Sequence, residues 1–273
     1  TEVAPRGVYC GTIGILLPKG KQIFNVAIRT LQMQGHQAIY GVGGGITWDS
    51  KWESEYQETK QKSAVLYRQE PHFELLTTGR IHQGELTFLE QHLSRLREAS
   101  RYFAYPYDEP KLLKELQEKL GHLKSNLDYR CRIALQKNGA FQLTITELTD
   151  LPASYLQAQL TEQKLDLATP VTYFKTSQRD HLGQSDHEQI FHLPDGSLLE
   201  TTIGNLVLEI EGQLYTPPAH LPLLDGIYRR HLLETQQVEE KLLTLNDLTD
   251  ADRIYACNAL RGLYALNLQR KDS

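Results

Sequence analysis

The sequence predicts an α+β protein of more than one domain, from three observations. Strand-like runs flank each of three turn signals, Asn138-Gly139, Asp195-Gly196 and Glu211-Gly212, and predict β-hairpins. Apolar residues recur at helical spacing over 87–103 and again after Asp108, which predicts two amphipathic helices. A chain of 273 residues has room for one large or two ordinary domains with a sizeable core.

Composition excludes several classes of function. The formal net charge of -5 argues against a nucleic-acid or anionic-membrane partner. No apolar run approaches the roughly 20 residues of a membrane span, and the first residues lack the features of a signal peptide. Three well-separated cysteines, Cys10, Cys131 and Cys257, contain no CxxC pair, which suits a reducing cytoplasm and argues against structural zinc.

Residues 1–65 are predicted to form a first domain. Alternation over 24–29 predicts a strand, and good helix formers over 53–66 predict a helix. The run at 43–45 is three glycines, which permit a sharp bend. Such a run could bind an anion through backbone N–H groups, but its spacing matches neither the dinucleotide fingerprint nor the P-loop.

Residues 66–160 are predicted to form a small domain. Its elements in order are strands at 73–80 and 81–86, helices at 87–103 and from 108, and strands at 129–136 and 140–148. Asp108-Glu109-Pro110 is typical of a helix start, with an N-cap and an early proline. The polar segment 149–163 is predicted to connect this domain to a larger one.

Residues 161–273 are predicted to form the larger domain. A mixed apolar run is expected to end as a strand at Lys175, and two hairpins follow. The remaining elements are a helix within 221–234, a short acidic helix within 242–252, and strands at 253–259 and 262–269.

Lys175 and Glu200 are the first candidates for chemistry. A lysine at the end of an apolar strand is a candidate for a depressed pKa, and its neutral amine can form a Schiff base with a carbonyl compound. Pyridoxal phosphate (PLP) needs such a lysine, an acid facing its pyridine nitrogen, and donors for its phosphate. Spacing alone favours the ordinary alternative, in which Lys175 is a solvated strand-end lysine and Glu200 a solvent-facing glutamate.

Two motifs decide between these alternatives. The runs KTSQR at 175–179 and LLETTIGNL at 198–206 resemble the fold-type IV PLP enzymes, which include branched-chain and D-amino acid aminotransferases and aminodeoxychorismate lyase. The resemblance implies a small α/β domain beside a larger β-barrel-like domain. LYTPP at 214–218 and NALRG at 258–262 point within that group to the lyase.

The resemblance also implies a set of site residues. Lys175 would be the catalytic lysine that carries PLP, and Glu200 would face the pyridine nitrogen. The phosphate would be held by an arginine within HLSRL at 92–96 and by two loops; these residues are Arg95, Gly226, Ile227, Asn258 and Ala259. Asp225 stands where the family usually has proline, so its carboxylate should point away from the phosphate.

Four further residues are expected at the substrate. They are Thr77, Thr78, Arg80 and Arg261. The family often has glutamate where this chain has threonine, which argues against an acid at that position. Arg80 could instead be a surface arginine at a strand end.

The first 65 residues resemble the C-terminal end of the chorismate-utilising enzymes, the anthranilate and aminodeoxychorismate synthase components. The matching residues are Tyr9 and Arg29 for chorismate, Gly44 for a carboxylate, and Glu55 and Glu58 for Mg²⁺. Trp52 departs from a position that is often proline. So few residues cannot close that large core, so we expect no synthase activity here and Mg²⁺ only in a complete domain. The chain is expected to be the tail of a longer bifunctional protein, with a glutamine amidotransferase as its candidate partner.

The implied reaction is the conversion of 4-amino-4-deoxychorismate to 4-aminobenzoate and pyruvate, a step of folate biosynthesis. A fold-type IV aminotransferase, of D-amino acid or branched-chain type, is the alternative enzyme, and a non-catalytic chorismate-binding remnant is the alternative without activity. By analogy we expect a homodimer. The irregularly spaced His181, His187 and His192 do not predict a metal site.

Overall fold

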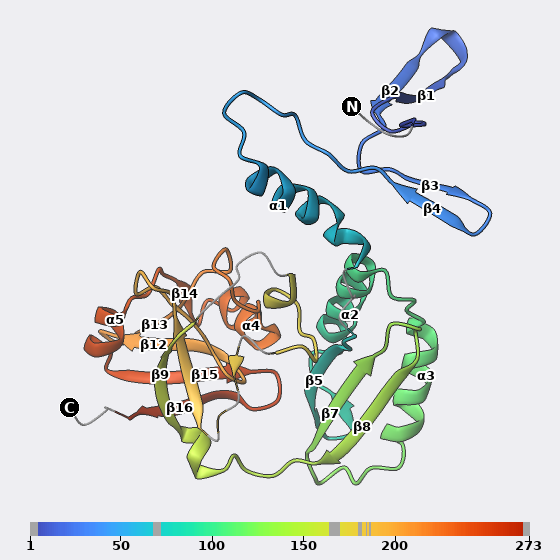
Figure 1. Cartoon of the computed structure of the whole chain (residues 1–273). Coiled ribbons are helices and arrows are strands. Elements are labelled where there is room, and N and C mark those ends of the chain that lie inside the picture. Colours follow the sequence, from blue (N-terminus) through green and yellow to red (C-terminus); the bar gives the residue numbers. More distant parts are fainter. Residues whose placement is uncertain are drawn as a thin grey trace. The chain divides into compact units, whose positions relative to one another are not determined.

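The structure is a computed structural model that describes residues 5–67, 72–163, 170–179, 182–183, 185 and 187–269. The chain divides into two compact units, Thr1–Pro71 and His72–Ser273 (Figure 1). His181 and residues 164–169 of the expected strand before Lys175 lie outside the described residues. In the part that the structure describes, no helix has the length and apolarity needed to cross a membrane.

The first unit consists of two antiparallel hairpins and one helix. Its elements are β1 Thr12–Leu16, the 3-10 helix η1 Pro18–Gly20, β2 Gln22–Val26, β3 Leu31–Gln34, β4 Gln37–Tyr40, α1 Trp52–Ser63 and the 3-10 helix η2 Ala64–Leu66. β1 pairs with β2 and β3 pairs with β4, but no pairing joins the two hairpins among the described residues. The expected strand at 24–29 and helix at 53–66 correspond to β2 and to α1 with η2.

Residues 5–67 of this unit form no apolar core of their own. Among residues 5–67, Ala27 is the one buried apolar side chain, and every residue of β1, β2 and β3 is exposed. Large side chains such as Ile15, Phe24 and Trp48 lie open to solvent. A unit of this kind gains little hydrophobic stabilisation, as we expected of so short a piece of a large sandwich.

The second unit begins with a four-stranded antiparallel sheet covered by two helices. The elements are β5 Leu75–His82, β6 Glu85–Leu86, α2 Leu89–Phe103, α3 Glu109–Leu120, β7 Tyr129–Leu135 and β8 Phe141–Glu147, with strand order β6-β5-β7-β8. Leu93, Leu96 and Ala99 of α2 are buried at the spacing predicted from the sequence. Leu112 and Leu116 of α3 are also buried, as predicted. These helices cover one face of the sheet and leave the other face available for a site.

Local signals fix the ends of these elements. The Asp108 side chain accepts a hydrogen bond from the Lys111 N–H (3.0 Å), as an N-cap does. β7 and β8 pair from Tyr129–Glu147 to Leu135–Phe141 around the Asn138-Gly139 turn, where Gly139 has a φ of 84°. Both features were predicted from the sequence.

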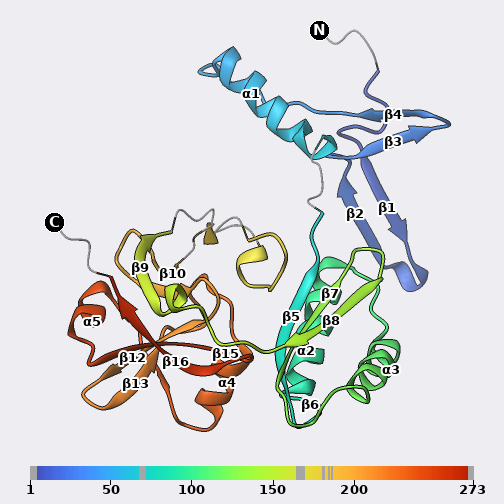
Figure 2. The ribbon, with the colours of Figure 1, turned by 90° about the horizontal axis from the view of Figure 1, so that it is seen from below.

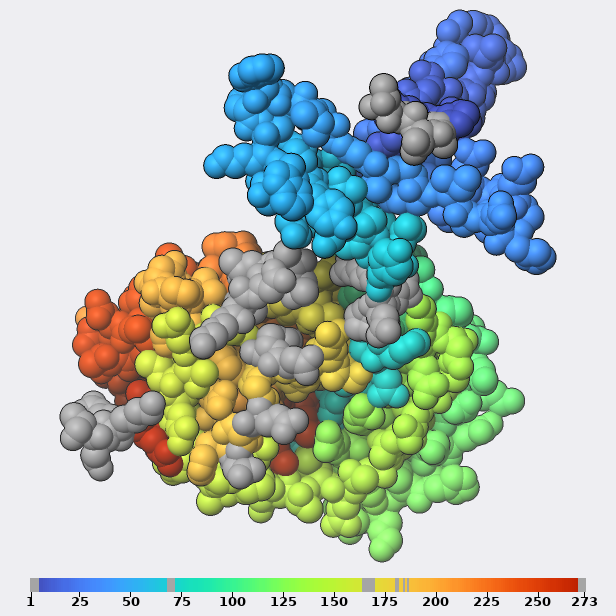
Figure 3. All heavy atoms as spheres, in the orientation of Figure 1, coloured from blue at the N-terminus to red at the C-terminus, as the bar shows by residue number. Residues whose placement is uncertain are grey.

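The rest of the second unit is a β-barrel with short helices on its outside. Its elements are η3 Ala153–Leu156, β9 Gln157–Glu162, η4 Pro170–Thr172, β10 Glu188–His192, β11 Leu198–Thr201, β12 Asn205–Ile210, β13 Gln213–Thr216, α4 Ile227–Glu234, β14 Glu239–Glu240, α5 Leu245–Asp250, β15 Arg253–Asn258 and β16 Gly262–Leu268. The sheet order is β11-β10-β9-β16-β15-β12-β13-β14, and a further pairing of β11 with β12 closes the barrel. The sheet domain and the barrel lie side by side (Figures 1, 2 and 3). The predicted α+β fold with a barrel-like larger domain is confirmed.

Two expectations for the middle of the chain were wrong. The polar connector at 149–163 contains η3 and β9, and β9 pairs in parallel with β10 and β16. Lys175 does not end a strand: it follows η4 in irregular backbone, and its carbonyl accepts a hydrogen bond from the Leu76 N–H (2.8 Å). Only Thr176 forms a bridge, to Leu75. The segment is therefore held against the edge of β5 by a few contacts instead of a ladder.

Candidate active site

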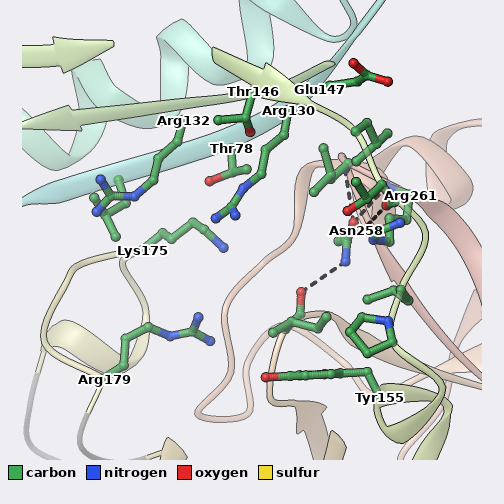
Figure 4. Close-up of a pocket in the computed structure, with 17 residues that line it drawn as sticks. Thr78, Arg130, Arg132, Thr146, Glu147, Tyr155, Lys175, Arg179, Asn258 and Arg261 are labelled. Carbon is green, nitrogen blue, oxygen red and sulfur yellow. Dashed lines mark hydrogen bonds between the residues drawn. The ribbon is translucent and has the colours of Figure 1, made fainter. Parts of the chain in front are cut away.

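Lys175 lies where the sheet domain meets the barrel. Its side chain is half-buried and lines an outer cavity of about 460 Å³ (Figure 4). It also lines an inner cavity of about 40 Å³. Burial lowers the pKa of Lys175 to about 7, the positive charges of Arg179 and Arg95 lower it further, and Glu200 opposes them. At neutral pH a large share of this amine is therefore unprotonated and nucleophilic.

Glu200 lines the inner cavity from β11. The residue is only 5% exposed, and burial raises the pKa of its carboxyl to about 7, against the opposing effects of the Leu224 N–H and Arg179. Its Oε1 accepts a hydrogen bond from the Leu224 N–H at 3.2 Å. A buried acid of this kind can hold a proton on, or donate one to, a ring nitrogen in the cavity.

A second group of residues that line the inner cavity could hold an anion. Gly226 and Ile227 line it at the start of α4, an eight-residue helix with no side-chain cap, so its first N–H groups are open to a ligand. Arg95 lines the same cavity from α2. Asn258 and Ala259 complete it; the Asn258 Oδ1 accepts from the backbone N–H of Arg261 at 2.9 Å and so fixes this loop.

The carboxylate of Asp225 is held by two neighbouring guanidinium groups. Its two oxygens accept from Arg229 Nη1 (2.9 Å) and Arg230 Nε (2.7 Å). The Asp225 carbonyl accepts from Arg95 Nη2 (2.8 Å). The negative charge is thus compensated, which removes the conflict expected from an acid in this loop.

All seven residues expected to hold the cofactor surround the one inner cavity. They are Arg95, Lys175, Glu200, Gly226, Ile227, Asn258 and Ala259. Arg95 belongs to α2, Lys175 to the segment that precedes β10, and Glu200 to β11. Gly226 and Ile227 stand at the start of α4, and Asn258 and Ala259 at the end of β15. Only the folded chain brings these residues together. A lysine, a buried acid and donors for an anion around one cavity match the three needs of PLP.

The expected substrate residues divide into two pairs. Thr78 and Arg261 line the outer cavity, and Arg261 Nη2 donates to the Thr149 carbonyl at 2.8 Å. Thr77 and Arg80 do not line it. The Thr77 hydroxyl faces the opposite side of β5 and bonds His92 Nδ1 at 2.6 Å, while Arg80 is paired with Asp128.

Three arginines of the outer cavity were not among the expected site residues. Arg130 and Arg132 project from β7, and Arg179 projects from the segment after Lys175 (Figure 4). Alternation in YRCRI could have indicated the first two, because residues two apart in a strand share a face. Arg179 stands inside the KTSQR motif, which was used only for its lysine.

The expected chorismate residues lie in the first unit. A Cβ on Gly44 would be 3.0 Å from Glu55 Oε2 and 3.8 Å from Glu58 Oε2, so these three are close together. Tyr9 lies against Gly41 and Gly43. The guanidinium of Arg29 has no hydrogen bond or ion pair within residues 5–67.

The part of the chain that the structure describes contains no group of three or more His, Cys, Asp or Glu side chains suited to a metal ion. His187 and His192 are described, and each bonds a backbone carbonyl through Nδ1.

Two family models match the chain. The class IV amino-transferase family matches residues 74–267, and the chorismate binding enzyme family matches residues 1–68. The first match covers most of the chain and coincides with the sheet domain, the barrel and the cavities between them. The chain therefore belongs to the class IV aminotransferases, the enzymes of fold type IV, whose members use PLP.

Individual relatives agree with this division. Aminodeoxychorismate synthase component 1 of Escherichia coli is 41% identical over 68 residues, which are 25% of this chain and 15% of that protein. The chain spans between 9% and 15% of the length of the first synthases that it matches. A putative amino-acid aminotransferase from Mesorhizobium loti has 27% identity and a TM-score of 0.64, with 72% of this chain and all of that one covered. A putative 4-amino-4-deoxychorismate lyase from Legionella pneumophila has 20% identity and a TM-score of 0.58 over 72% of this chain and 83% of that one, which shows the shared fold.

Proposed function

We propose that the second unit is a PLP-dependent lyase that converts 4-amino-4-deoxychorismate to 4-aminobenzoate and pyruvate. The observation that carries the proposal is Lys175: an amine with a pKa lowered to about 7, at the junction of an anion-binding inner cavity and an outer cavity lined by arginines. A segment similar to chorismate-binding enzymes precedes this unit in the chain. Because a synthase of that kind would make the substrate that such a lyase uses, the two activities would act in succession.

The residues present fit PLP. Arg95, the open N–H groups at the start of α4 and the Asn258-Ala259 loop would hold the phosphate, and Lys175 would carry the aldehyde carbon. Glu200 would bond the pyridine nitrogen and keep it protonated. When bound, PLP supplies an electron sink for charge that develops on the substrate.

Lys175 is also the group placed to move the proton. When its amine is free, Lys175 would be the base that removes the proton from C4 of the substrate, because it lines both the inner and the outer cavity. Loss of that proton and breakage of the bond between C3 and the ether oxygen make the ring aromatic. The leaving enolpyruvate takes up a proton and becomes pyruvate, so atoms balance without an oxidant or reductant. Thr78 and Arg261 would orient the substrate from the cavity walls.

The alternative is an aminotransferase. The 27% identity to a putative amino-acid aminotransferase over that whole chain favours it as the second candidate. Both reactions use the same lysine, so the products separate them. With purified 4-amino-4-deoxychorismate, we expect 4-aminobenzoate and pyruvate in equal amounts and no dependence on a 2-oxoacid. Amino transfer to a 2-oxoacid, with no aromatic product, would replace the lyase by the aminotransferase.

Three further expectations belong to this proposal. The enzyme should be a cytoplasmic homodimer, which light scattering on the holoenzyme can test for assembly. A longer form of the protein would use a glutamine amidotransferase as its ammonia source. The first unit, which lacks a core, should not convert chorismate with ammonia and Mg²⁺, and measured conversion by this chain would contradict that.

A further inference from the structure

The wall of the outer cavity contains a pair of arginines in adjacent positions of one sheet face. Arg132 lies opposite Thr78 in the pairing of β7 with β5, and Arg130 lies opposite Thr146 in the pairing with β8. Residues directly opposite in an antiparallel pair share a face, and all four line the outer cavity. Cys131, between the two arginines, is buried in the apolar core on the other face. Both arginines thus extend from β7 toward the cavity, and the Arg130 guanidinium ends near the Lys175 amine (Figure 4).

Basic residues outnumber acidic residues in the lining of this cavity. Five basic residues line it, and the acid among its lining residues is Glu147, which is exposed and turned away from the cations in Figure 4. The lining basic residues are Lys175, Arg130, Arg132, Arg179 and Arg261. Close like charges are unfavourable unless a ligand supplies the opposite charge. The cavity is therefore arranged for a ligand with more than one negative group.

Of these cations, Arg130 and Arg132 are held most weakly by hydrogen bonds and ion pairs to other described residues. Within the described residues, the Arg130 guanidinium has no hydrogen-bond or ion-pair partner. Arg132 pairs with Glu74 at 3.3 Å, and both side chains of that pair are about 30% exposed. Partly exposed ion pairs of this kind are weak. Both guanidinium groups can therefore turn to a bound carboxylate at little cost.

The other arginines near this cavity already bind protein groups. Arg179 donates to the Thr202 carbonyl and lines the inner cavity as well. Arg261 donates to the Thr149 carbonyl on the connector between the domains. Arg80, on the same sheet face as Arg130, is engaged by Asp128 outside the cavity. A carboxylate near β7 would thus meet Arg130 and Arg132 first.

We propose that Arg130 and Arg132 bind a second carboxylate of the substrate, so that the site selects amines with two carboxylates over amines with one. Arg261 would meet the first carboxylate from the barrel side. The assignment rests on the proposed function only for the amine chemistry at Lys175. Each guanidinium fork can give a carboxylate two parallel N–H donors, which a lysine would not provide.

The experiment compares two non-reacting probes on the PLP-loaded enzyme. Isophthalate has two carboxylates and benzoate has one; their dissociation constants would be measured by calorimetry. We expect isophthalate to bind at least tenfold more tightly. Arg130→Gln and Arg132→Gln should each weaken isophthalate about tenfold to a hundredfold, the range for one lost charge-assisted hydrogen bond, and leave benzoate within about twofold.

The controls separate charge, geometry and folding. Arg101→Gln removes an exposed arginine of α2 outside the cavity and should change neither constant. Arg132→Lys keeps the charge and loses the fork, so it should recover less than half of the lost binding energy. Far-ultraviolet circular dichroism and the bound-PLP absorbance show whether each variant is folded, and the single variants test the pair if the double variant is not.

Two results would overturn the assignment. Equal losses for benzoate and isophthalate would mean that the arginines act only through a general positive field. An unchanged preference for isophthalate in a folded Arg130→Gln/Arg132→Gln variant would place the second carboxylate elsewhere. Neither result depends on turnover, so failure of the lyase assay and failure of this assignment are distinguishable.

Discussion

Gly226→Ala adds one methyl group, which we expect to displace the loop that forms the proposed anion site at the start of α4. The Gly226 φ of -71° and ψ of 143° suit alanine, so backbone strain is not involved. A Cβ there would lie 1.9 Å from Asn205 Oδ1, whereas Cβ contacts under 3.0 Å essentially do not occur, so the amide must retreat by about 1.1 Å. That movement breaks the bond from Asn205 Nδ2 to the Leu224 carbonyl (2.7 Å).

The cost of Gly226→Ala follows from that bond. A buried polar group left without its partner costs about 1–3 kcal/mol, which for a unit of this size lowers Tm by roughly 2–10 °C. Leu224 also donates to Glu200, so the displaced loop disturbs both the N–H groups of α4 and the acid. Loss of one charge-assisted hydrogen bond to the phosphate would weaken PLP binding about tenfold to a hundredfold.

Urea unfolding of the apo-protein and PLP titration followed by absorbance measure the two effects separately. Gly121→Ala is the matched control: its φ is -61° and the nearest atom to its added Cβ is 3.6 Å away. It should change stability by less than about 0.5 kcal/mol. In a double-mutant cycle, Asn205→Ala with Gly226→Ala should cost less than the sum of the single changes. A Gly226→Ala variant that binds PLP like the Gly121→Ala control would refute the assignment of the α4 start to the phosphate.

Three other predictions use the same site and its support. Glu200→Gln should lower kcat by at least about a hundredfold while PLP still binds, because an amide cannot keep the pyridine nitrogen protonated; a near-normal rate argues against that role. Because the pKa of Lys175 is lowered to about 7 and only the neutral amine reacts, borohydride trapping of PLP on the apo-protein should rise with pH to a plateau above about 8; a rise continuing to about 10.5 indicates an ordinary lysine. Gly79→Ala should destabilise the apo-protein by about 1–3 kcal/mol in urea, because its Cβ would lie 2.4 Å from Nε2 of the buried His92; a stability equal to wild type would show that His92 can move.

Much of the fold was predictable because its signals are local. The hairpin at Asn138-Gly139 needs a turn with a positive φ, and the N-cap at Asp108 needs one short side chain within three residues. Heptad-like spacing of leucines marks the buried face of α2. These patterns are complete within a few residues, so the sequence shows them directly.

The errors share the opposite property. Lys175 was expected at a strand end, but its backbone is fixed by β5, about 100 residues earlier in the chain. Arg80 was expected at the substrate, but Asp128, 48 residues further on, engages it. Alternation could have placed Arg130 and Arg132 on one face of a strand, but the pairing of β7 with β5 and β8 was needed to show that this face lines the cavity. Local sequence patterns do not show which distant segments of the chain pair with one another.

Resemblance to the family motifs predicted some of the residues that lie far apart in the sequence and close together in the fold. The residues expected for the cofactor all line the inner cavity, although they are spread from Arg95 to Ala259. The residues expected for the substrate were less well placed, since Thr77 faces His92 on the other side of β5. The residues expected for the cofactor thus share one cavity, whereas those expected for the substrate are divided between the outer cavity and positions outside it.

The proposed function requires PLP to be joined to the amine of Lys175. Borohydride reduction of the holoenzyme, followed by proteolysis and mass measurement of the peptides, shows which lysine carries the cofactor. We expect one phosphopyridoxyl group per chain, on the peptide that contains Lys175, and none in the Lys175→Ala variant. A label on any other lysine, or full turnover by Lys175→Ala, would contradict it.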